Sequence, residues 1–305
     1  MNILILGSNG QVGWELQRAL VPLGSVISLS RHGDGGLAGD LADPGKVAET
    51  VRKVSPDVIV NAAAYTAVDR AETEPDLAEL VNTKAASTLA REARSLGAWL
   101  VHYSTDYVFD GSGTRPWQEN DAPAPLNVYG KTKRQGEFAI EDSGCRHLIF
   151  RTSWVYAARG NNFIRSMLRL ASERDALDIV DDQYGAPTGA ALIADVTAHA
   201  LHMVVNGKGA SGLFHLTASG ETTWHGYATR IVQRAREAGW PVSVSPGNIK
   251  PISTCAFPTK ACRPRNSRLD RTRLEQTFGL RMPPWQAGVD HALSEILHAG
   301  MALSE

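Results

Sequence analysis

Short apolar segments alternate with longer amphipathic segments along the first half of the chain. The apolar segments predict strands at residues 2–6, 25–30, 57–60, 99–103 and 147–150. The amphipathic segments carry apolar residues at helical spacing and predict helices at residues 11–23, 44–54, 77–96 and 127–140. Strands that are apolar throughout are typical of a parallel sheet buried on both faces. We therefore expect an α/β fold with a doubly wound parallel sheet of the Rossmann type.

The second half of the chain is less regular. Its pattern predicts helices at residues 162–174, 190–205 and 224–238, and a strand at 212–216. Repeated prolines between residues 241 and 267 indicate loops and short extended pieces. We expect residues 1–155 to form the sheet domain. Residues 156–305 are expected to form mainly a smaller C-terminal lobe, with a later segment that returns to the sheet domain.

Composition and charge narrow the classes of function. The 305 residues include 31 Lys plus Arg and 32 Asp plus Glu, so the formal net charge is −1. This balance disfavours a surface that grips nucleic acid or an anionic membrane. The three cysteines, Cys145, Cys255 and Cys262, form neither a disulfide framework nor a CxxC zinc motif. We see no signal peptide and no apolar stretch of membrane-spanning length, so we expect a cytosolic location.

Three glycines follow the first predicted strand at regular spacing: Gly7, Gly10 and Gly13. Glycine permits a tight turn that brings backbone N–H groups and a helix N-terminus against a pyrophosphate. Because this turn joins a strand directly to a helix, the pattern predicts dinucleotide binding, with Gln11 and Val12 at the start of the helix.

The end of the second predicted strand indicates which dinucleotide is bound. An acidic residue there would hold the ribose 2′-hydroxyl of NAD, but the sequence has Arg31, which suits a 2′-phosphate. We therefore favour NADPH and leave NADH open, as we do a solvated role for this arginine. The expected cofactor contacts beyond the glycine turn are Arg31, Asp40, Leu41, Ala63, Ala64, Tyr65 and Tyr103.

Tyr129 and Lys133 are four residues apart in a predicted helix and therefore share one face. A neighbouring ammonium lowers the pKa of a tyrosine, so the pair can pass a proton to a carbonyl oxygen. Thr105 lies at the carboxyl end of the fourth predicted strand, the edge at which open α/β sheets bind ligands. Its hydroxyl can bind the same reacting oxygen. These residues predict a reductase site.

These motifs together resemble the extended short-chain dehydrogenases/reductases. Longer segments resemble one family within that group, the dTDP-4-dehydrorhamnose reductases. They are residues 101–109 (VHYSTDYVF), 125–133 (PLNVYGKTK), 150–156 (FRTSWVY), 182–188 (DQYGAPT) and 263–268 (RPRNSR). The resemblance covers essentially the whole chain. It implies a dinucleotide-binding domain at residues 1–155 and a mainly substrate-binding lobe at residues 156–305.

The resemblance also implies an activity, the reduction of the C4 ketone of dTDP-6-deoxy-L-lyxo-4-hexulose to give dTDP-L-rhamnose. Tyr129 would donate the proton to the C4 oxygen, and Thr105 would bind that oxygen. Lys133 would hold the nicotinamide ribose and keep the pKa of Tyr129 low. The residues expected to contact the sugar nucleotide are Thr105, Asp106, Trp154, Asn162 and Arg268.

One position departs from the family pattern. Some members dimerise around Mg²⁺ through two glutamates. Glu15 matches the first, but Ala191 stands at the second and has no oxygen to offer a hard cation. We therefore expect no metal and regard Mg²⁺ as doubtful, although a homodimer stays open.

Two alternatives are carried forward. One is another sugar-nucleotide epimerase, dehydratase or reductase of the same fold; Asp106-Tyr107 is not the Asp-Glu pair that dehydratases need. The other is a non-catalytic NADP-binding regulatory subunit resembling that of methionine adenosyltransferase. The presence of Thr105, Tyr129 and Lys133 argues against this second reading.

Overall fold

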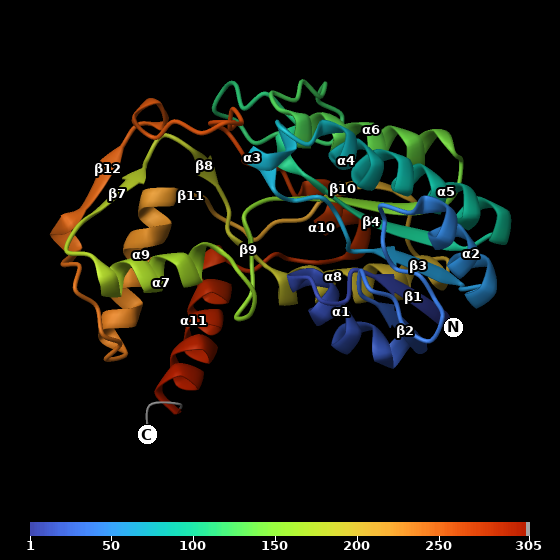
Figure 1. Cartoon of the computed structure of the whole chain (residues 1–305), viewed down its shortest axis with the longest axis horizontal. Helices are drawn as coiled ribbons and strands as arrows, with labels where there is room; N and C mark the ends of the chain where they lie inside the picture. Colours follow the sequence, from blue (N-terminus) through green and yellow to red (C-terminus); the bar gives the residue numbers. More distant parts are fainter. Residues whose placement is uncertain (303–305) are drawn as a thin grey trace.

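A six-stranded parallel sheet forms the larger part of the molecule, whose computed structural model describes residues 1–302 (Figure 1). The strand order is β10-β5-β4-β3-β1-β2. The strands are β1 (Asn2–Leu6), β2 (Ser25–Leu29), β3 (Val58–Asn61), β4 (Trp99–Thr105), β5 (Arg146–Thr152) and β10 (Gly212–His215). The predicted doubly wound fold is confirmed. The strand order reverses between β1 and β3, and ligands of such sheets bind at the carboxyl ends of the strands at this point.

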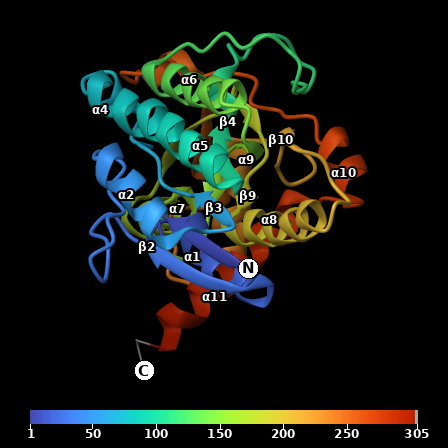
Figure 2. The ribbon, with the colours of Figure 1, turned by 90° about the vertical axis from the view of Figure 1, so that its right-hand side faces the viewer.

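Helices cover both faces of the sheet (Figure 2). One face carries α1 (Gln11–Leu20), α8 (Ala190–Val205) and α10 (Thr272–Phe278). The other carries α2 (Pro44–Val54), α5 (Ala85–Leu96) and α6 (Val128–Asp142). Side chains of a strand alternate between the two faces, so Ile3 and Ile5 of β1 join one core while Leu4 and Leu6 join the other.

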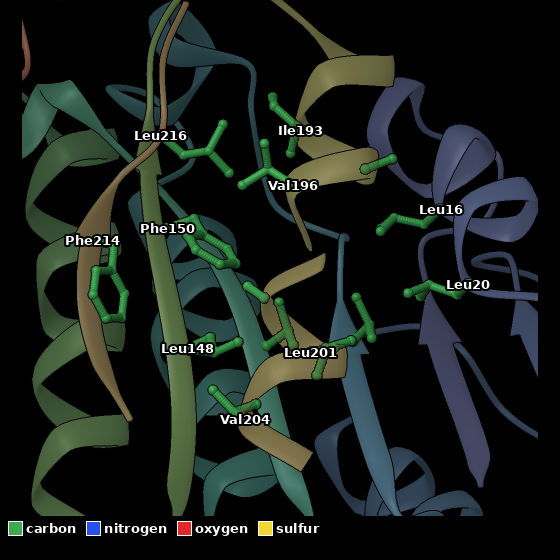
Figure 3. Packing of buried hydrophobic residues seen from close by; sticks show 14 of the residues in the cluster. Leu16, Leu20, Leu148, Phe150, Ile193, Val196, Leu201, Val204, Phe214 and Leu216 are labelled. Atoms are coloured by element: carbon green, nitrogen blue, oxygen red, sulfur yellow. The ribbon is translucent and has the colours of Figure 1, made fainter. Parts of the chain in front are cut away.

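The packing between α1, α8 and the sheet is drawn in Figure 3, where the side chains of α8 lie between Leu16 and Leu20 of α1 and the apolar side chains of β5. All the strand residues in this core are fully or almost fully buried. Helix α8 and strand β10 belong to the sheet domain, although both follow residue 155 in the sequence. The domain boundary after residue 155 stays a prediction.

A long helical run ends in α5. It begins with α4 (Pro75–Glu79), continues through a π-helical stretch at Leu80–Lys84 and passes directly into α5. The short helix α3 (Val68–Ala71) lies before it. The single helix predicted at residues 77–96 therefore begins earlier and includes a widened turn. Asn82 lies in that turn and is buried.

The smaller lobe has its own core, built around α7 (Phe163–Glu173), α9 (Trp224–Glu237) and α11 (Trp285–Ala302), as Figure 1 shows. Its strands form two-stranded pairs: β7 (Leu177–Val180) with β12 (Ile249–Ile252), β8 (Tyr184–Gly185) with β11 (Thr222–Thr223), and β6 (Val155–Tyr156) with β9 (Thr188–Gly189). Strand β12 is an extended piece in the proline-rich segment. Within residues 1–302, no helix is both long enough and apolar enough to cross a membrane.

Candidate active site

The glycine turn after β1 is closed by backbone contacts that leave no room for side chains. Gly7 has a φ of 91°, and a Cβ there would lie 2.7 Å from the backbone nitrogen of Ala63. A Cβ on Gly13 would lie 2.0 Å from the carbonyl oxygen of Gly7. Gly10 caps α1 with no side chain, so the N–H groups of Gln11, Val12 and Gly13 have no partner within the helix. This arrangement fits an anion such as a pyrophosphate.

The segment after β3 lies directly against this turn. Asn61 Oδ1 accepts a hydrogen bond from the Ala63 N–H (3.2 Å), which holds Ala63 and Ala64 at the sheet edge. The Tyr65 N–H donates to Asn82 Oδ1 (2.9 Å), and the Tyr65 hydroxyl donates to Glu74 Oε2 (2.5 Å). The hydroxyl of Tyr65 is therefore already engaged by a carboxylate.

Arg31 and Asp40, predicted separately for the cofactor, contact each other. Arg31 Nε lies 3.1 Å from Asp40 Oδ2, and the arginine side chain is 71% exposed. Exposed ion pairs contribute little to stability, so a phosphate could engage the guanidinium at small cost. Leu41 is buried in the core beneath α2 and presents no polar group of its own.

Tyr129 and Lys133 lie on α6, and the start of this helix is held tightly. Asn127 caps the helix by accepting from the Gly130 N–H (2.8 Å) and donates to the carbonyl of Cys262 (2.8 Å). A Cβ on Gly130 would lie 2.1 Å from the carbonyl oxygen of Tyr107. Glycine here lets α6 approach the turn that follows Thr105. The predicted catalytic residues are thus brought to the same sheet edge as the glycine turn.

The proton chemistry of Tyr129 differs from the expectation. Burial raises the pKa of Tyr129 to about 12, although the neighbouring Thr105 hydroxyl opposes the rise. Lys133 is buried and directs its Nζ to the carbonyl of Tyr103 (2.6 Å) and to His102 Nε2 (3.1 Å). In this arrangement the amine of Lys133 bonds to groups of β4 and does not lower the pKa of Tyr129.

The hydroxyl of Thr105 is fixed by its own turn. It donates to Asp106 Oδ1 (3.1 Å) and accepts from the Tyr107 N–H (3.2 Å). Burial raises the pKa of Asp106 to about 7, and its Oδ2 has no hydrogen-bond partner. A buried polar atom without a partner is costly, so Asp106 fits a ligand that supplies a hydroxyl.

Tyr103 and the substrate-lobe residue Trp154 occupy different surroundings. The Tyr103 hydroxyl pairs with Thr197 of α8 (2.8 Å), which places its side chain on the α8 face of the sheet. Trp154 has a φ of 49° and stacks on Trp224 with ring centroids 3.7 Å apart. A Cβ on Gly185 would lie 2.7 Å from the Trp154 ring, so the indole is packed closely between Gly185 and Trp224.

Asn162 and Arg268 lie in different parts of the site. Asn162 caps α7, and its Nδ2 donates to Gln11 Oε1 (2.9 Å), which places it beside the glycine turn. Arg268 is 13% exposed, pairs with Glu221 (2.5 Å) and lies over the ring of Tyr184 at 4.2 Å. Asn162 therefore joins the cofactor end of the site, whereas Arg268 presents an oriented cation in the lobe.

Comparison with known proteins agrees with this geometry. The family model described as "RmlD substrate binding domain" matches residues 1–298. The dTDP-4-dehydrorhamnose reductase of Escherichia coli K12 is 54% identical over 296 residues, which cover 97% of this chain and 98% of that protein. The chain belongs to the dTDP-4-dehydrorhamnose reductase family.

Solved structures of dTDP-4-dehydrorhamnose reductases superpose on nearly the whole chain. The Clostridium acetobutylicum protein has a TM-score of 0.87 at 34% identity and covers 96% of this chain and 99% of its own. The Bacillus anthracis protein, solved in complex with NADP, has a TM-score of 0.86 at 34% identity with the same coverage. The family and the fold predicted from the motifs are confirmed.

Glu15, which matches the first glutamate of the family pattern, takes part in an ion-pair cluster with α8. Glu15 lies 3.7 Å from Arg18, which contacts Asp195 of α8 at 2.8 Å. Ala191 is on the same helix, one turn before Asp195. Among the described residues, no group of three or more His, Cys, Asp or Glu side chains is placed to hold a metal ion. The expectation that the protein binds no Mg²⁺ stays a prediction.

Sequence reasoning missed several residues that shape the site. His102 and Asn61 contact Lys133 or the segment after β3, and both are polar residues within buried apolar strands, which is a signal that could have found them. Glu221 and Trp224 engage Arg268 and Trp154, but only the folding of the lobe brings them there. No local pattern identifies those two.

Proposed function

We propose that this protein reduces the C4 ketone of dTDP-6-deoxy-L-lyxo-4-hexulose (dTDP-4-dehydrorhamnose) to the alcohol of dTDP-L-rhamnose, using NAD(P)H. The observation that carries the proposal is the 54% identity over nearly the whole length of a dTDP-4-dehydrorhamnose reductase. The gathering of Thr105, Tyr129 and Lys133 at the carboxyl edge of the sheet supports it. The protein is an oxidoreductase of a sugar nucleotide.

The glycine turn would hold the cofactor pyrophosphate through the N–H groups of Gln11, Val12 and Gly13. Arg31 would hold the 2′-phosphate of NADPH, and Ala63 and Ala64 would line the path of the cofactor. When bound, the nicotinamide supplies the hydride.

The chain's own residues handle the proton and the developing charge. Tyr129 keeps its proton at neutral pH because burial raises its pKa to about 12, so it can donate that proton to the C4 oxygen. The Thr105 hydroxyl would bind the same oxygen as negative charge develops. Trp154 and Arg268 would hold the sugar and the diphosphate, and Asp106 would accept a sugar hydroxyl at its unpartnered Oδ2.

The test is the loss of absorbance at 340 nm with purified protein, the dTDP ketosugar, and NADPH or NADH in parallel. Oxidation that requires the ketosugar is expected, with NADPH the faster cofactor. The same assay with the UDP analogue tests the nucleotide. Cofactor binding without oxidation of any ketosugar would contradict the proposal and favour a regulatory role. A homodimer and a cytosolic location remain predictions.

A further inference from the structure

His102 is a buried titratable residue that the proposed mechanism does not use. Its side chain, on β4, is 1% exposed and lies between two other buried side chains. Its Nδ1 is 3.1 Å from Asn61 Nδ2, and its Nε2 is 3.1 Å from Lys133 Nζ. The three side chains form a continuous line from the end of β3 to the helix that carries Tyr129.

The orientation of Asn61 fixes one end of this line. The backbone N–H of Ala63 can only donate, so the amide atom facing it must be the oxygen, Oδ1. The amide nitrogen of Asn61 therefore faces His102. Since that nitrogen can only donate, His102 Nδ1 must accept and carry no proton.

The state of His102 then constrains Lys133. Burial lowers the pKa of His102 well below its usual value, so the ring is neutral and carries a single N–H. With Nδ1 accepting, that proton lies on Nε2 and points at Lys133 Nζ. A neutral amine can accept this hydrogen bond, but an ammonium has only donors. The bond from Nζ to the Tyr103 carbonyl (2.6 Å) can form in either state.

Some surroundings of Lys133 lower its pKa and others raise it. Burial lowers the pKa of Lys133 to about 8, and the charge of Glu137, one turn along α6, opposes this. Glu137 is itself paired with the buried Arg151 of β5 (2.7 Å), which offsets its charge. Tyr129, one turn in the other direction, is uncharged at neutral pH, and Asp106 faces Tyr129 from the turn after β4.

We infer that His102 is a positioning residue that, together with Asn61, links the tautomer of its own ring to the protonation state of Lys133. The free amine completes every hydrogen bond in the line. The ammonium forces the ring proton to Nδ1, where it opposes the amide of Asn61. Lys133 therefore gains and loses its proton near pH 8, close to the range in which Tyr129 must recover the proton it donates. Only this last consequence rests on the proposed function.

The test follows both groups by NMR in the ligand-free full-length protein. Labelling with ¹⁵N-histidine reports the tautomer of His102, and ¹³Cε-lysine reports the titration of Lys133, whose signal is assigned by its loss in Lys133→Met. As the pH rises through about 8, we expect His102 to change from the Nδ1–H to the Nε2–H form over the range in which Lys133 titrates. A tautomer that does not change with pH, or a Lys133 that titrates near the ordinary lysine value, would overturn the inference.

Two substitutions separate this role from a merely structural one. In His102→Gln the side-chain amide can turn its oxygen toward Nζ and accept from the ammonium, so the pKa of Lys133 should rise by about one unit. In His102→Leu no acceptor is present, and the pKa should not rise. A structural role alone would leave the Lys133 titration unchanged in the glutamine variant and lower turnover equally at every pH.

His147→Gln is the matched control, because His147 lies on β5 and bonds the carbonyl of Cys145, away from Lys133. It should leave the Lys133 titration unaltered, and a shift there equal to that of His102→Gln would also overturn the inference. Both NMR readouts need no substrate. They therefore hold or fail independently of ketosugar reduction, which the assay at 340 nm measures.

Discussion

The sheet domain and the smaller lobe contribute different kinds of groups to the site: backbone groups in the first and large side chains in the second. In the sheet domain the site is built mainly from backbone atoms. It depends on Gly7 and Gly13, where a side chain would clash with the neighbouring backbone. In the lobe the site consists of large side chains, with Trp154 stacked on Trp224 and gripped by Gly185. A backbone seat suits a cofactor with a fixed pyrophosphate, whereas a side-chain surface can be adjusted to one particular sugar nucleotide.

The largest effect should come from Tyr129, a residue of the sheet domain that would act on the sugar nucleotide held by the lobe. Tyr129→Phe removes only the proton donor, so turnover should fall by about 10²-fold or more while cofactor affinity stays near normal. Single-turnover rates and a cofactor titration by fluorescence measure the two quantities. Near-normal turnover would remove Tyr129 from the mechanism.

A second prediction concerns Asp106, whose pKa burial raises to about 7. The same group in the unfolded chain has a pKa of about 4, so between these values the folded protein alone holds the proton. Its contribution to stability is fully present below about pH 4 and is lost as the pH rises to about 7.

The free energy of unfolding of the wild type should therefore fall relative to that of Asp106→Asn by about 4 kcal/mol as the pH rises through this window. Urea unfolding of both proteins at a series of pH values measures the difference. Curves that run parallel would show that Asp106 is ionised in the folded protein.

A pair of glycine variants tests the comparison directly. In Gly13→Ala the new Cβ would meet the Gly7 carbonyl at 2.0 Å, so cofactor affinity should fall about tenfold or more, at least about 1.4 kcal/mol. In Gly185→Ala the Cβ would press on the Trp154 ring at 2.7 Å, and the KM for the ketosugar should rise about tenfold.

Each variant should leave the other ligand's binding nearly unchanged. Calorimetric titration with NADPH and steady-state kinetics with the ketosugar measure the two effects. If both variants weakened both ligands equally, the division of labour between the two regions would be wrong.

The smallest effect is expected at the exposed rim of the sheet domain. Arg31→Ala should weaken NADPH several-fold and NADH hardly at all, because only the former carries the 2′-phosphate. Asp40→Asn is the matched control, since it frees Arg31 from its 3.1 Å partner and should strengthen NADPH slightly. An equal loss for both cofactors in Arg31→Ala would assign the specificity elsewhere.

The sequence predicts the sheet domain well because its signals are local. The bounds of α2 (Pro44–Val54) and α8 (Ala190–Val205) coincide with those expected from apolar periodicity. The lobe was predicted less completely. β7 and β12 pair across about seventy residues, and each is too short to show a pattern by itself. The C-terminal helices α10 and α11 were not predicted.

The site shows the same division. The glycine turn and the Tyr129–Lys133 spacing are readable because both depend on neighbours within one turn of helix. The pairing of Arg31 with Asp40 and the line from Asn61 through His102 to Lys133 depend on contacts between separate elements. Such contacts determine the role of a residue, but they produce no pattern in the sequence around it.

The π-helical stretch at Leu80–Lys84 places one extra residue in a turn between α4 and α5. Asn82 bonds the backbone of Tyr65 on one side and Thr132 of α6 on the other, so one widened turn joins the cofactor segment to the helix of Tyr129. Deleting one residue there would restore α-helical hydrogen bonding and leave the phase of α5 nearly unchanged, because a π turn holds about one residue more than an α turn. The apolar stripe of α5 would keep its partners, but the widened turn that presents Asn82 to Tyr65 and Thr132 would be lost. The extra residue therefore serves the connection between the cofactor segment and α6, and the packing of α5 does not depend on it.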